Sequence, residues 1–380
     1  METSIQLLVF ALAFFTGIQL LYWLLVFSKI SFLNQTEQSL SQEQPGISVI
    51  VAAWDELQNL KELLPLLNDQ DYPNFEVIVI DDRSTDGSYD HLLFDIQHLS
   101  KVRFIKIEKT PSHITAKKYA LTLGIKGALY DVILLTDADC RPQSTNWMAG
   151  MVAHLTPNKD IVLGLSPYYQ FKGWLNSFIR FDTFYTALQY TAFAKVGLAY
   201  MGVGRNLMYR KHLFFESKGF HSHNHIIGGD DDLFMNEVAT KNNVAVSLDS
   251  DTFVYSMPKT NFGEWYSQKR RHLSVGKYYR FRNKAMLGLL GLSQTLVWLL
   301  FIALMVLCGI QKDWHWMAWG GGIFGIRLLV EWIWFGLASP KLGNMIHWKM
   351  IPVYDFLLFI YSAVLGTIST LSRKKLVTWK

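Results

Sequence analysis

Two aspartates, Asp137 and Asp139, stand at the end of a short apolar run, and their spacing points to metal chemistry. The run 131–136 (Asp-Val-Ile-Leu-Leu-Thr) is typical of a buried strand, and such a strand delivers the side chains that follow it to the edge where α/β proteins bind ligands. Hard oxygen ligands at that edge suit Mg2+ or Mn2+ holding a diphosphate. The alternative is a strand followed by a helix cap, because Asp is also common where helices begin.

Two further loops carry acidic side chains after predicted strands. One loop is 54–56 (Trp-Asp-Glu), and the other begins with Asp81 and Asp82 and continues through 84–87 (Ser-Thr-Asp-Gly). Three acidic loops on one rim would repel one another unless cationic or hydrogen-bonding groups lie among them, and a nucleotide with its metal would supply these. We therefore expect Asp81 and Asp82 to contact a ligand, whereas 84–87 indicates a helix N-cap with a structural role.

The elements that must position these loops alternate between strand and helix. Apolar runs predict strands at 47–53, 75–80, 102–107 and up to residue 136, and amphipathic stretches predict helices at 56–67, 89–99 and 115–127. Strands too apolar to face water on either side are typical of a mainly parallel sheet with helices on both faces. The predicted fold class is therefore α/β and Rossmann-like, with ligands beyond the strand ends.

The apolar surplus of this 380-residue chain, which is 50% hydrophobic, collects at its two ends. Segment 5–27 is uncharged and, at ~1.5 Å per residue, is long enough to cross the ~30 Å hydrocarbon layer. It lacks the basic start of a cleaved signal peptide, so we expect a retained anchor. Later candidate spans are 285–310, 314–337 and 351–371. Within the middle one, Arg327 and Glu331 lie one helical turn apart and could form an ion pair, or that segment could lie at the membrane interface.

Basic residues predict how the chain is oriented in a membrane. Lys29 follows the first apolar segment, and a basic cluster at 277–284 precedes the second, which places the polar domain between them in the cytoplasm. The basic residues 373–375 also favour the cytoplasm, a condition that two C-terminal spans satisfy and three do not. We expect a multi-pass protein of the inner or plasma membrane, with the number of C-terminal spans left open.

These patterns predict five regions and exclude two classes of protein. The regions are an N-terminal transmembrane anchor at 1–28, a linker at 29–45, a catalytic domain at 46–281, a C-terminal membrane region of two or three helices at 282–372, and a basic tail at 373–380. The formal charge of +5 collects beside the apolar segments, so we expect no nucleic-acid partner. The two cysteines, Cys140 and Cys308, do not make a disulfide framework.

Several segments, in order along the chain, resemble glycosyltransferase family 2, the inverting enzymes with a GT-A fold. They are Val-Ile-Val-Ala-Ala-Trp-Asp-Glu at 49–56, Tyr-Pro-Asn-Phe-Glu-Val-Ile-Val-Ile-Asp-Asp-Arg-Ser-Thr-Asp-Gly at 72–87, Ala-Lys at 116–117 with Ala-Leu at 120–121, Asp-Ala-Asp at 137–139, Gly-Gly-Asp-Asp-Asp-Leu-Phe at 228–234, and Gln-Lys-Arg-Arg-His at 268–272. Against the family pattern, Ala52 replaces Pro, Asp55 replaces Asn, Gly229 replaces an acidic residue, and His272 stands where processive synthases carry Trp.

The resemblance implies a role for individual residues. Asp139, with Asp137, would hold the divalent cation, Mg2+ or Mn2+, and the catalytic base would be Asp230, with Asp231 as the alternative. The acceptor side would be lined by Arg205 and Asn206, and the nucleotide-sugar donor, for which we expect a UDP-sugar, would be held by Ala52, Glu56, Asp81, Asp82, Lys117, Asp137, Ala138, Gln268, Arg271 and His272.

The implied chemistry agrees with these residue types. A divalent cation stabilises the negative charge that builds on a departing nucleoside diphosphate, and inversion in one step needs a carboxylate to accept the acceptor's hydroxyl proton. We therefore expect transfer of a sugar to a hydroxyl of a lipid-linked or cell-envelope glycan acceptor at the membrane. A processive polysaccharide synthase is the alternative among enzymes, and a non-catalytic membrane scaffold that binds nucleotide is the alternative from another class.

Overall fold

The computed structural model describes residues 2–33 and 44–371, which form two compact units. The middle of the chain, up to Tyr279, forms one unit, and the two ends of the chain, with the second end beginning at Arg280, form the other. The predicted catalytic domain at 46–281 falls almost entirely within the middle unit. The predicted basic tail at 373–380 and most of the predicted linker lie outside the described residues, and the first residues of that linker continue a helix.

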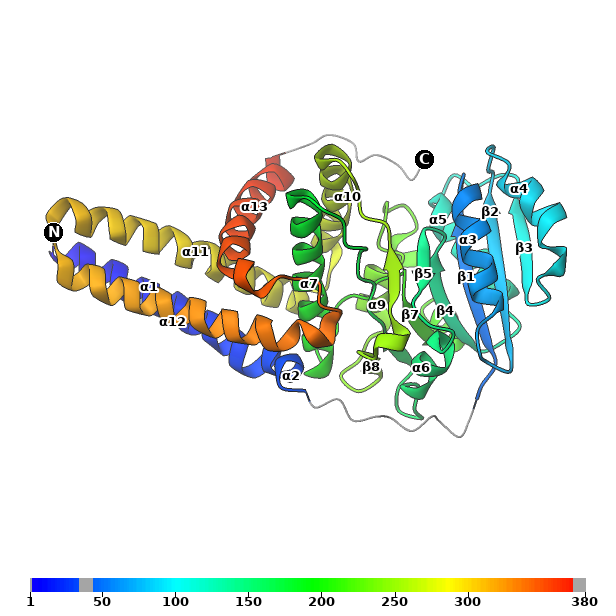
Figure 1. The fold of residues 1–380 in the computed structure, drawn as a ribbon, viewed down its shortest axis with the longest axis horizontal. Helices are drawn as coiled ribbons and strands as arrows, with labels where there is room; N and C mark the ends of the chain where they lie inside the picture. The colour runs from blue at the N-terminus through cyan, green and yellow to red at the C-terminus, as the bar shows by residue number, and fades with distance from the viewer. Residues whose placement is uncertain (1, 34–43, 372–380) are drawn as a thin grey trace. The chain divides into compact units, whose positions relative to one another are not determined.

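The central unit is built on a seven-stranded sheet in the order β3-β2-β1-β4-β7-β6-β8 (Figure 1). The strands are β1 Ile47–Ala53, β2 Phe75–Asp82, β3 Val102–Ile107, β4 Val132–Asp137, β6 Ile161–Leu163, β7 Leu207–Arg210 and β8 Val244–Val246, and β5 Cys140–Pro142 pairs antiparallel with β9 Val254–Ser256 in a small second sheet. β7 runs antiparallel to both of its neighbours, whereas the other pairs in the large sheet are parallel. The prediction of a mainly parallel sheet is confirmed.

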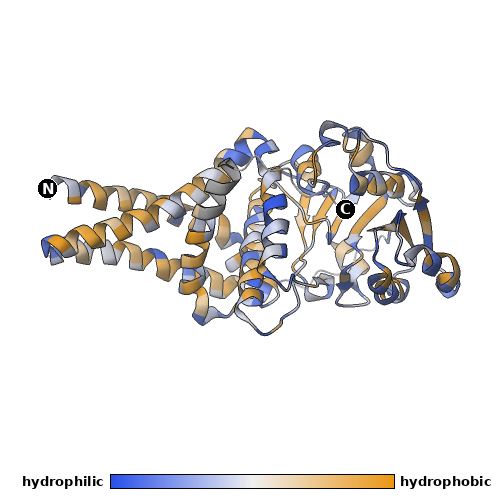
Figure 2. Ribbon diagram, turned by 90° about the horizontal axis from the view of Figure 1, so that it is seen from above, coloured by the Kyte–Doolittle hydropathy of each residue, from blue (hydrophilic) through white to orange (hydrophobic). Residues whose placement is uncertain are grey.

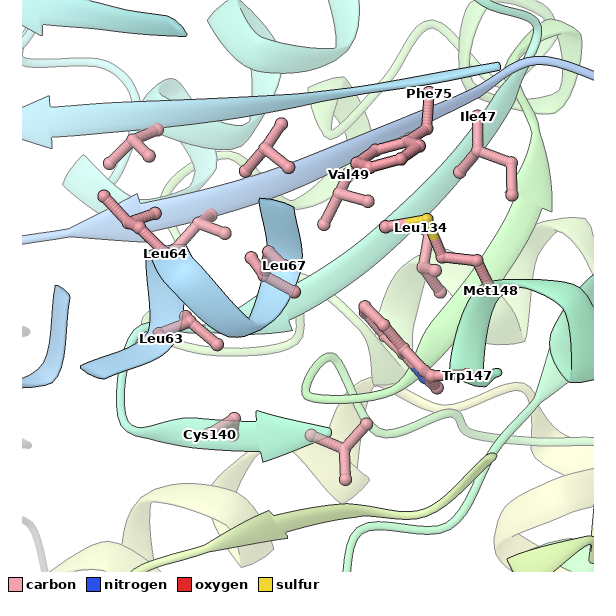
Figure 3. Packing of buried hydrophobic residues seen from close by; sticks show 14 of the residues in the cluster. Ile47, Val49, Leu63, Leu64, Leu67, Phe75, Leu134, Cys140, Trp147 and Met148 are labelled. Carbon is pink, nitrogen blue, oxygen red and sulfur yellow. The ribbon is translucent and has the colours of Figure 1, made fainter. Parts of the chain in front are cut away.

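Helices cover both faces of this sheet, as its apolar strands require. The longer ones are α3 Leu57–Asn68, α5 Ala116–Gly127, α6 Trp147–Ala153, α7 Trp174–Lys195, α9 Asp232–Val238 and α10 Phe262–Val275. On one face, Val49 and Leu134 pack against Leu63 of α3 and Trp147 of α6 (Figure 3). On the other face α5 approaches closely at Gly124, where an added Cβ would lie 2.7 Å from both Ile50 and Ile80. Only glycine permits that approach.

The predicted helix at 89–99 is less regular than its sequence suggests. It consists of one short turn, α4 Ser88–Asp90, followed by a π-helical turn, His91–Asp95, and a 3-10 turn, Ile96–His98. Leu92 and Ile96 nevertheless remain buried, so the four-residue apolar spacing that suggested a helix still describes which side chains face the core.

The unit formed by the chain ends contains long apolar helices, and Figure 2 shows hydrophobic residues along much of their length. They are α1 Glu2–Tyr22, which continues through a π-helical turn, Trp23–Phe27, into α2 Ser28–Ser31, then α11 Phe281–Gln311, α12 Trp314–Ala338 and α13 Ile351–Leu371. Among the described residues, three stretches are long and apolar enough to cross a membrane, namely Thr3–Ser31, Phe281–Gln311 and Trp314–Ala338.

The predicted ion pair on α12 is confirmed and gains an additional partner. Arg327 Nη1 lies 2.7 Å from Glu331 Oε2, and the guanidinium also forms a two-pronged pair with Asp355 of α13, in which Nη2 donates to Oδ1 at 2.8 Å. Trp298 and Gln294 of α11 donate to the same Asp355 carboxylate at 2.9 Å and 3.0 Å. One buried cation therefore ties α12 to α13 and, through Asp355, to α11.

Candidate functional site

The carboxyl ends of β2, β1 and β4 lie side by side, and this arrangement gathers the acidic loops. In the sheet register Ala53 of β1 pairs with Asp81 of β2, and Ala52 pairs with Asp137 of β4. Ala52 and Ala138 are small and buried, which leaves room at the rim between the acidic side chains. The predicted convergence of three acidic loops on one sheet edge is confirmed, and Asp137 is itself the last residue of its strand.

A lysine on α5 joins this rim to a segment almost a hundred residues further along the chain. Lys117 Nζ donates to Asp137 Oδ1 at 3.0 Å and lies 3.2 Å from Asp230 Oδ2. The two carboxylate oxygens are therefore at most about 6 Å apart. Both carboxylates raise the pKa of Lys117 despite the burial that opposes its charge, so the ammonium is a fixed cation between them.

Asp139 is held in an environment that disfavours its charge. Burial and then the neighbouring Asp137 carboxylate raise the pKa of Asp139, while Arg205 and Lys117 oppose that rise. The Cys140 thiol donates to Asp139 Oδ1 at 3.5 Å, and the guanidinium of Arg205 lies 4.6 Å from the ring centre of Tyr168. A buried carboxylate with a raised pKa beside a second carboxylate is a favourable site for an added cation.

The donor set at Asp137 and Asp139 fits a divalent cation of the magnesium type. Among the described residues there is no cluster of three or more His, Cys, Asp or Glu side chains arranged to hold a metal. Mg2+ is commonly bound through one or two carboxylates, with substrate phosphates and water completing the shell. The two rim aspartates match that pattern, provided that a diphosphate supplies further oxygens.

Asp230 is presented by a tight turn of two glycines. Gly228 and Gly229 have φ values of +80° and +74°, and a Cβ at Gly229 would lie 2.7 Å from Leu233. A glutamate at this position would be strained and would clash, which explains why the acidic residue of the family pattern is missing here. Asp230 is 9% exposed, and although burial raises its pKa, Lys117 and other groups outweigh that effect and lower it.

Asp231 and Asp232 make internal contacts. The Asp231 carboxylate accepts from the backbone N–H of Gly204 and that of Asp232, both at 2.8 Å, and so caps α9. Burial and the adjacent Asp230 raise the pKa of Asp231 to about 6. Asp232 accepts from the Tyr279 hydroxyl at 2.9 Å. Of the three aspartates, Asp230 is the one that pairs with the cation at the rim.

The β1 and β2 ends form a second half of the site. Asn59 donates to Glu56 Oε2 at 2.5 Å, and burial raises the pKa of Glu56. Asp81 is fully buried, and burial raises its pKa, a rise that the nearby Ser84 offsets in part. No group in the described structure meets hydrogen-bond geometry with the carboxylate oxygens of Asp81. Asp82 is paired instead with Arg83 at 2.8 Å. Asp81 is thus the better placed of the two to receive a donor from a ligand.

The polar turn at 84–87 has the structural role that its sequence predicted. Asp86 accepts from the backbone N–H of Leu57 and that of Ser88, both at 2.9 Å. Ser84 accepts from the N–H of Asp55, which has a φ of +52°. Asp and Asn both tolerate this left-handed conformation, so the presence of Asp at position 55, where the family pattern has Asn, leaves the backbone conformation unchanged.

Three more of the predicted residues come from a helix late in the central unit. Gln268, Arg271 and His272 lie on α10. Surrounding protein atoms lower the pKa of His272, and the positive charges of Arg271, Lys269, Arg205 and Lys117 lower it further. Helix α10 is therefore within electrostatic range of Lys117 at the rim.

Asn206 requires a correction. Its side chain is fully buried, donates to the carbonyl oxygens of Leu165 and Thr252 at 2.8 Å and 2.7 Å, and accepts from the Trp147 indole at 3.0 Å. Because these bonds use its amide completely inside the core, we no longer place Asn206 among the acceptor-facing groups. Arg205 faces the rim near Asp139.

Sequence reasoning missed Lys118. It is 1% exposed and donates to the carbonyl oxygens of His223 and Ile226, each at 2.7 Å. Burial lowers the pKa of Lys118 to about 8. It ties α5 to the loop that leads into Asp230, so adjacent lysines position the two sides of the site. No local pattern could have identified it, because its partners are backbone atoms far along the chain.

Comparison with known proteins supports this description. A family model described as glycosyl transferase family 2 matches residues 48–216. The poly-beta-1,6-N-acetyl-D-glucosamine synthase of Staphylococcus epidermidis is 29% identical over 102 residues, 27% of this chain and 24% of that protein. The protein of the same name from Staphylococcus aureus strain COL is 26% identical over 135 residues, 34% of this chain and 32% of that protein. The chain therefore aligns with about a quarter to a third of these curated relatives.

A solved structure shows the fold. The mannosyltransferase PcManGT from Pyrobaculum calidifontis, in complex with GDP-Man and Mn2+, superposes with a TM-score of 0.62 at 17% identity, covering 97% of this chain and 100% of that one. The family match, the sheet order and the gathered acidic rim agree with one another. Residues 48–216 thus match the model of glycosyl transferase family 2, and the chain has the GT-A fold.

Proposed function

We propose that this protein is a membrane-anchored, metal-dependent inverting glycosyltransferase that moves a sugar from a nucleoside-diphosphate sugar to a hydroxyl of a lipid-linked or cell-envelope glycan. The observation that carries the proposal is the bridge made by Lys117, which brings the Asp137 end of the acidic motif and the Asp230 carboxylate to within about 6 Å of each other. A single displacement needs a metal-binding carboxylate and a catalytic base that act on the same bound nucleotide-sugar.

The rim supplies the groups that hold the donor. Asp137 and Asp139 would ligate Mg2+ or Mn2+, which when bound neutralises charge on the departing diphosphate. The complex of PcManGT with Mn2+ supports a divalent cation in this fold. The buried Asp81 carboxylate, which lacks a hydrogen-bond donor, and Glu56 would bind the base and ribose. Lys117 and Arg205 add positive charge where the diphosphate would lie.

Asp230 would act as the base. Because its pKa is lowered by Lys117, it is ionised at neutral pH and can accept the proton of the attacking hydroxyl. Asp231 retains a structural role, since both of its oxygens accept backbone N–H groups. These contacts support Asp230 rather than Asp231 as the proposed base.

Replacing Asp230 tests the proposal directly. Asp230→Asn keeps the shape but cannot accept a proton, so turnover should fall by at least ~100-fold while binding of the nucleotide-sugar, followed by thermal stabilisation, persists. Asp251→Asn, an exposed aspartate in the same unit, is the matched control and should retain activity. Unchanged turnover in Asp230→Asn would refute the assignment, and absence of turnover in the unmodified protein with every donor tested would favour the non-catalytic scaffold.

A processive synthase is a second candidate, favoured by the names of the staphylococcal relatives. The two candidates differ in product length. Transfer of one sugar per encounter gives products extended by single residues at early times, whereas processive synthesis gives long chains while most acceptor is still unused. Measuring product size in the first percent of the reaction separates them.

We also propose that the central unit lies on the cytoplasmic side of a cell membrane. Lys29 and the basic residues near 277–284 flank it, and positively charged flanks are retained in the cytoplasm. A single cysteine introduced at the exposed Lys126 of a Cys140→Ser, Cys308→Ser chain should resist a membrane-impermeant thiol reagent in intact cells and react after lysis. Labelling in intact cells would place the unit outside.

A further inference from the structure

A groove in the central unit lies outside the candidate active site and has no role in the proposed function. Its volume is about 670 Å3, and its walls come from α3, β5 and β9 together with a segment that follows β6. Glu62, Leu66, Arg141, Gln143, Tyr169 and Tyr255 line it. It is open to solvent, and it combines aromatic rings with charged and amide groups.

Two tyrosines form a platform in this groove. The rings of Tyr169 and Tyr255 stack with their centres 5.1 Å apart and their planes at 28°. Three extended segments fix them, because Arg141 of β5 pairs with Tyr255 of β9, and Tyr169 N–H donates to the Ser256 carbonyl at 3.1 Å. Both rings keep partial exposure, so an aromatic surface is presented by a sheet rather than by a mobile loop.

Polar groups stand beside the platform in a fixed arrangement. Arg141 Nη2 donates to Glu62 Oε2 at 2.8 Å and to Asn59 Oδ1 at 3.0 Å, while Nη1 donates to the carbonyl oxygens of Ala138 and Cys140 at 3.0 Å and 2.7 Å. Four acceptors thus fix the position and orientation of the guanidinium. Its charge is matched by the Glu62 carboxylate, so the groove has little net attraction for a phosphate.

The groove adjoins the donor site through direct contacts. Arg141 holds the carbonyl of Ala138, the central residue of the acidic motif. Asn59 accepts from Arg141 and donates to Glu56 at 2.5 Å. Along the other wall, Tyr168 stacks under Arg205 while the next residue, Tyr169, stacks in the groove. A ligand in the groove would therefore lie against the outer side of the loop that carries the metal ligands.

These features together match a sugar ring. A pyranose has a face of C–H groups that packs on an aromatic ring and a rim of hydroxyls that need both hydrogen-bond donors and acceptors. The exposed Glu62 carboxylate supplies acceptors, and the exposed Gln143 amide supplies both. We propose that this groove binds a pyranose residue of a glycan, as a subsite beside the donor loop. The ligand class rests on the proposed function, whereas the groove itself does not.

Binding of defined oligosaccharides to the full-length protein tests the proposal. Saturation-transfer NMR would be recorded on the protein in lipid nanodiscs with short oligomers of N-acetylglucosamine, mannose and glucose. We expect transfer to ring C–H protons of at least one series, and a loss of affinity of about tenfold or more in Tyr169→Ala and in Tyr255→Ala. Phe94→Ala removes an aromatic ring that is 69% exposed outside the groove, and should bind as the unmodified protein does.

The possible results are distinct. Absence of transfer to all three series, or equal binding by the tyrosine variants, would overturn the proposal, as would displacement of the oligosaccharide by a nucleoside diphosphate. Gln143→Ala, at an exposed side chain, gives a second test if a tyrosine variant does not fold. Glycan binding without any nucleotide-sugar turnover would refute the enzyme and leave the groove standing. With turnover, elongation of the bound oligosaccharide would mark it as acceptor, and an unaltered oligosaccharide would mark it as a separately held glycan.

Discussion

Removing the charge of Lys117 should disturb the candidate active site directly. In Lys117→Met the carboxylates of Asp137 and Asp230 lose the ammonium that lies 3.0 Å and 3.2 Å from them. Two unit charges about 6 Å apart repel by ~3 kcal/mol at an effective dielectric constant of ~20. The lysine side chain is 23% exposed, so water screens this repulsion only in part.

The repulsion should appear in the pH dependence of the reaction. The Lys117 cation favours the ionised form of Asp230, so its removal raises the pKa of that carboxyl, and a base must be ionised to act. The acid limb of the kcat/KM profile should therefore move up by about two pH units, because ~3 kcal/mol corresponds to about two units of pKa. The loss should approach about a hundredfold at pH values below the limb and become small at neutral pH.

Two control variants separate charge from structure. Lys117→Arg keeps the cation and should retain the acid limb, and Lys126→Met removes an exposed charge from the last turn of the same helix and should change little. The reasoning would be refuted if Lys117→Met kept the unmodified profile, or if it raised the donor KM alone without a shift of the acid limb. The latter result would mean that Lys117 only contacts the nucleotide.

Two other predictions concern stability. Glu76 accepts hydrogen bonds from the Ser48 hydroxyl, the Arg103 guanidinium and the Leu129 N–H. These bonds outweigh burial and lower the pKa of Glu76 below its ordinary value of 4.5. The Glu76 carboxylate therefore stabilises the fold above pH 4.5, and this stabilisation is lost as the pH falls through the lower pKa of the folded state. Thermal unfolding of Glu76→Gln should show a lower Tm at pH 7 and a smaller further drop on acidification, and an unaltered acid dependence would contradict this. Arg327→Met leaves two buried carboxylates without their cation and should destabilise the apolar unit by about 3–5 kcal/mol, while additional Glu331→Gln and Asp355→Asn changes should restore much of the loss. A single variant that unfolds in nanodiscs at the same temperature as the unmodified protein would argue against that account.

Local patterns predicted the first half of the central unit well, for a physical reason. Strands β1, β2 and β4 are apolar runs bounded by polar turns, and parallel pairing then forces their carboxyl ends to one edge, so Asp81 and Asp137 could be placed together in advance. The later strands β5 to β9 have only three or four residues each, too few for any periodicity to identify them.

What the sequence could not predict depends on contacts between distant residues. Asp355 completes the ion cluster of Arg327 from another helix, and Tyr169 meets Tyr255 because its own segment hydrogen-bonds to Ser256 of β9. The resemblance placed Asn206 at the acceptor, but its fit against Gly164, where a Cβ would lie 2.3 Å from the amide, shows that it is a core residue. Such roles follow from tertiary packing, which spacing along the chain does not encode.

The central claim is that one crevice holds a diphosphate, its metal and the Asp230 base. The most direct measurement is an experimental structure of the full chain with Mn2+ and a nucleoside diphosphate, with the metal located by its anomalous scattering. We predict a single manganese peak bound by Asp137 and Asp139 and by the diphosphate, with Asp230 in the same cavity. A peak elsewhere, or Asp230 facing a separate cavity, would contradict the account.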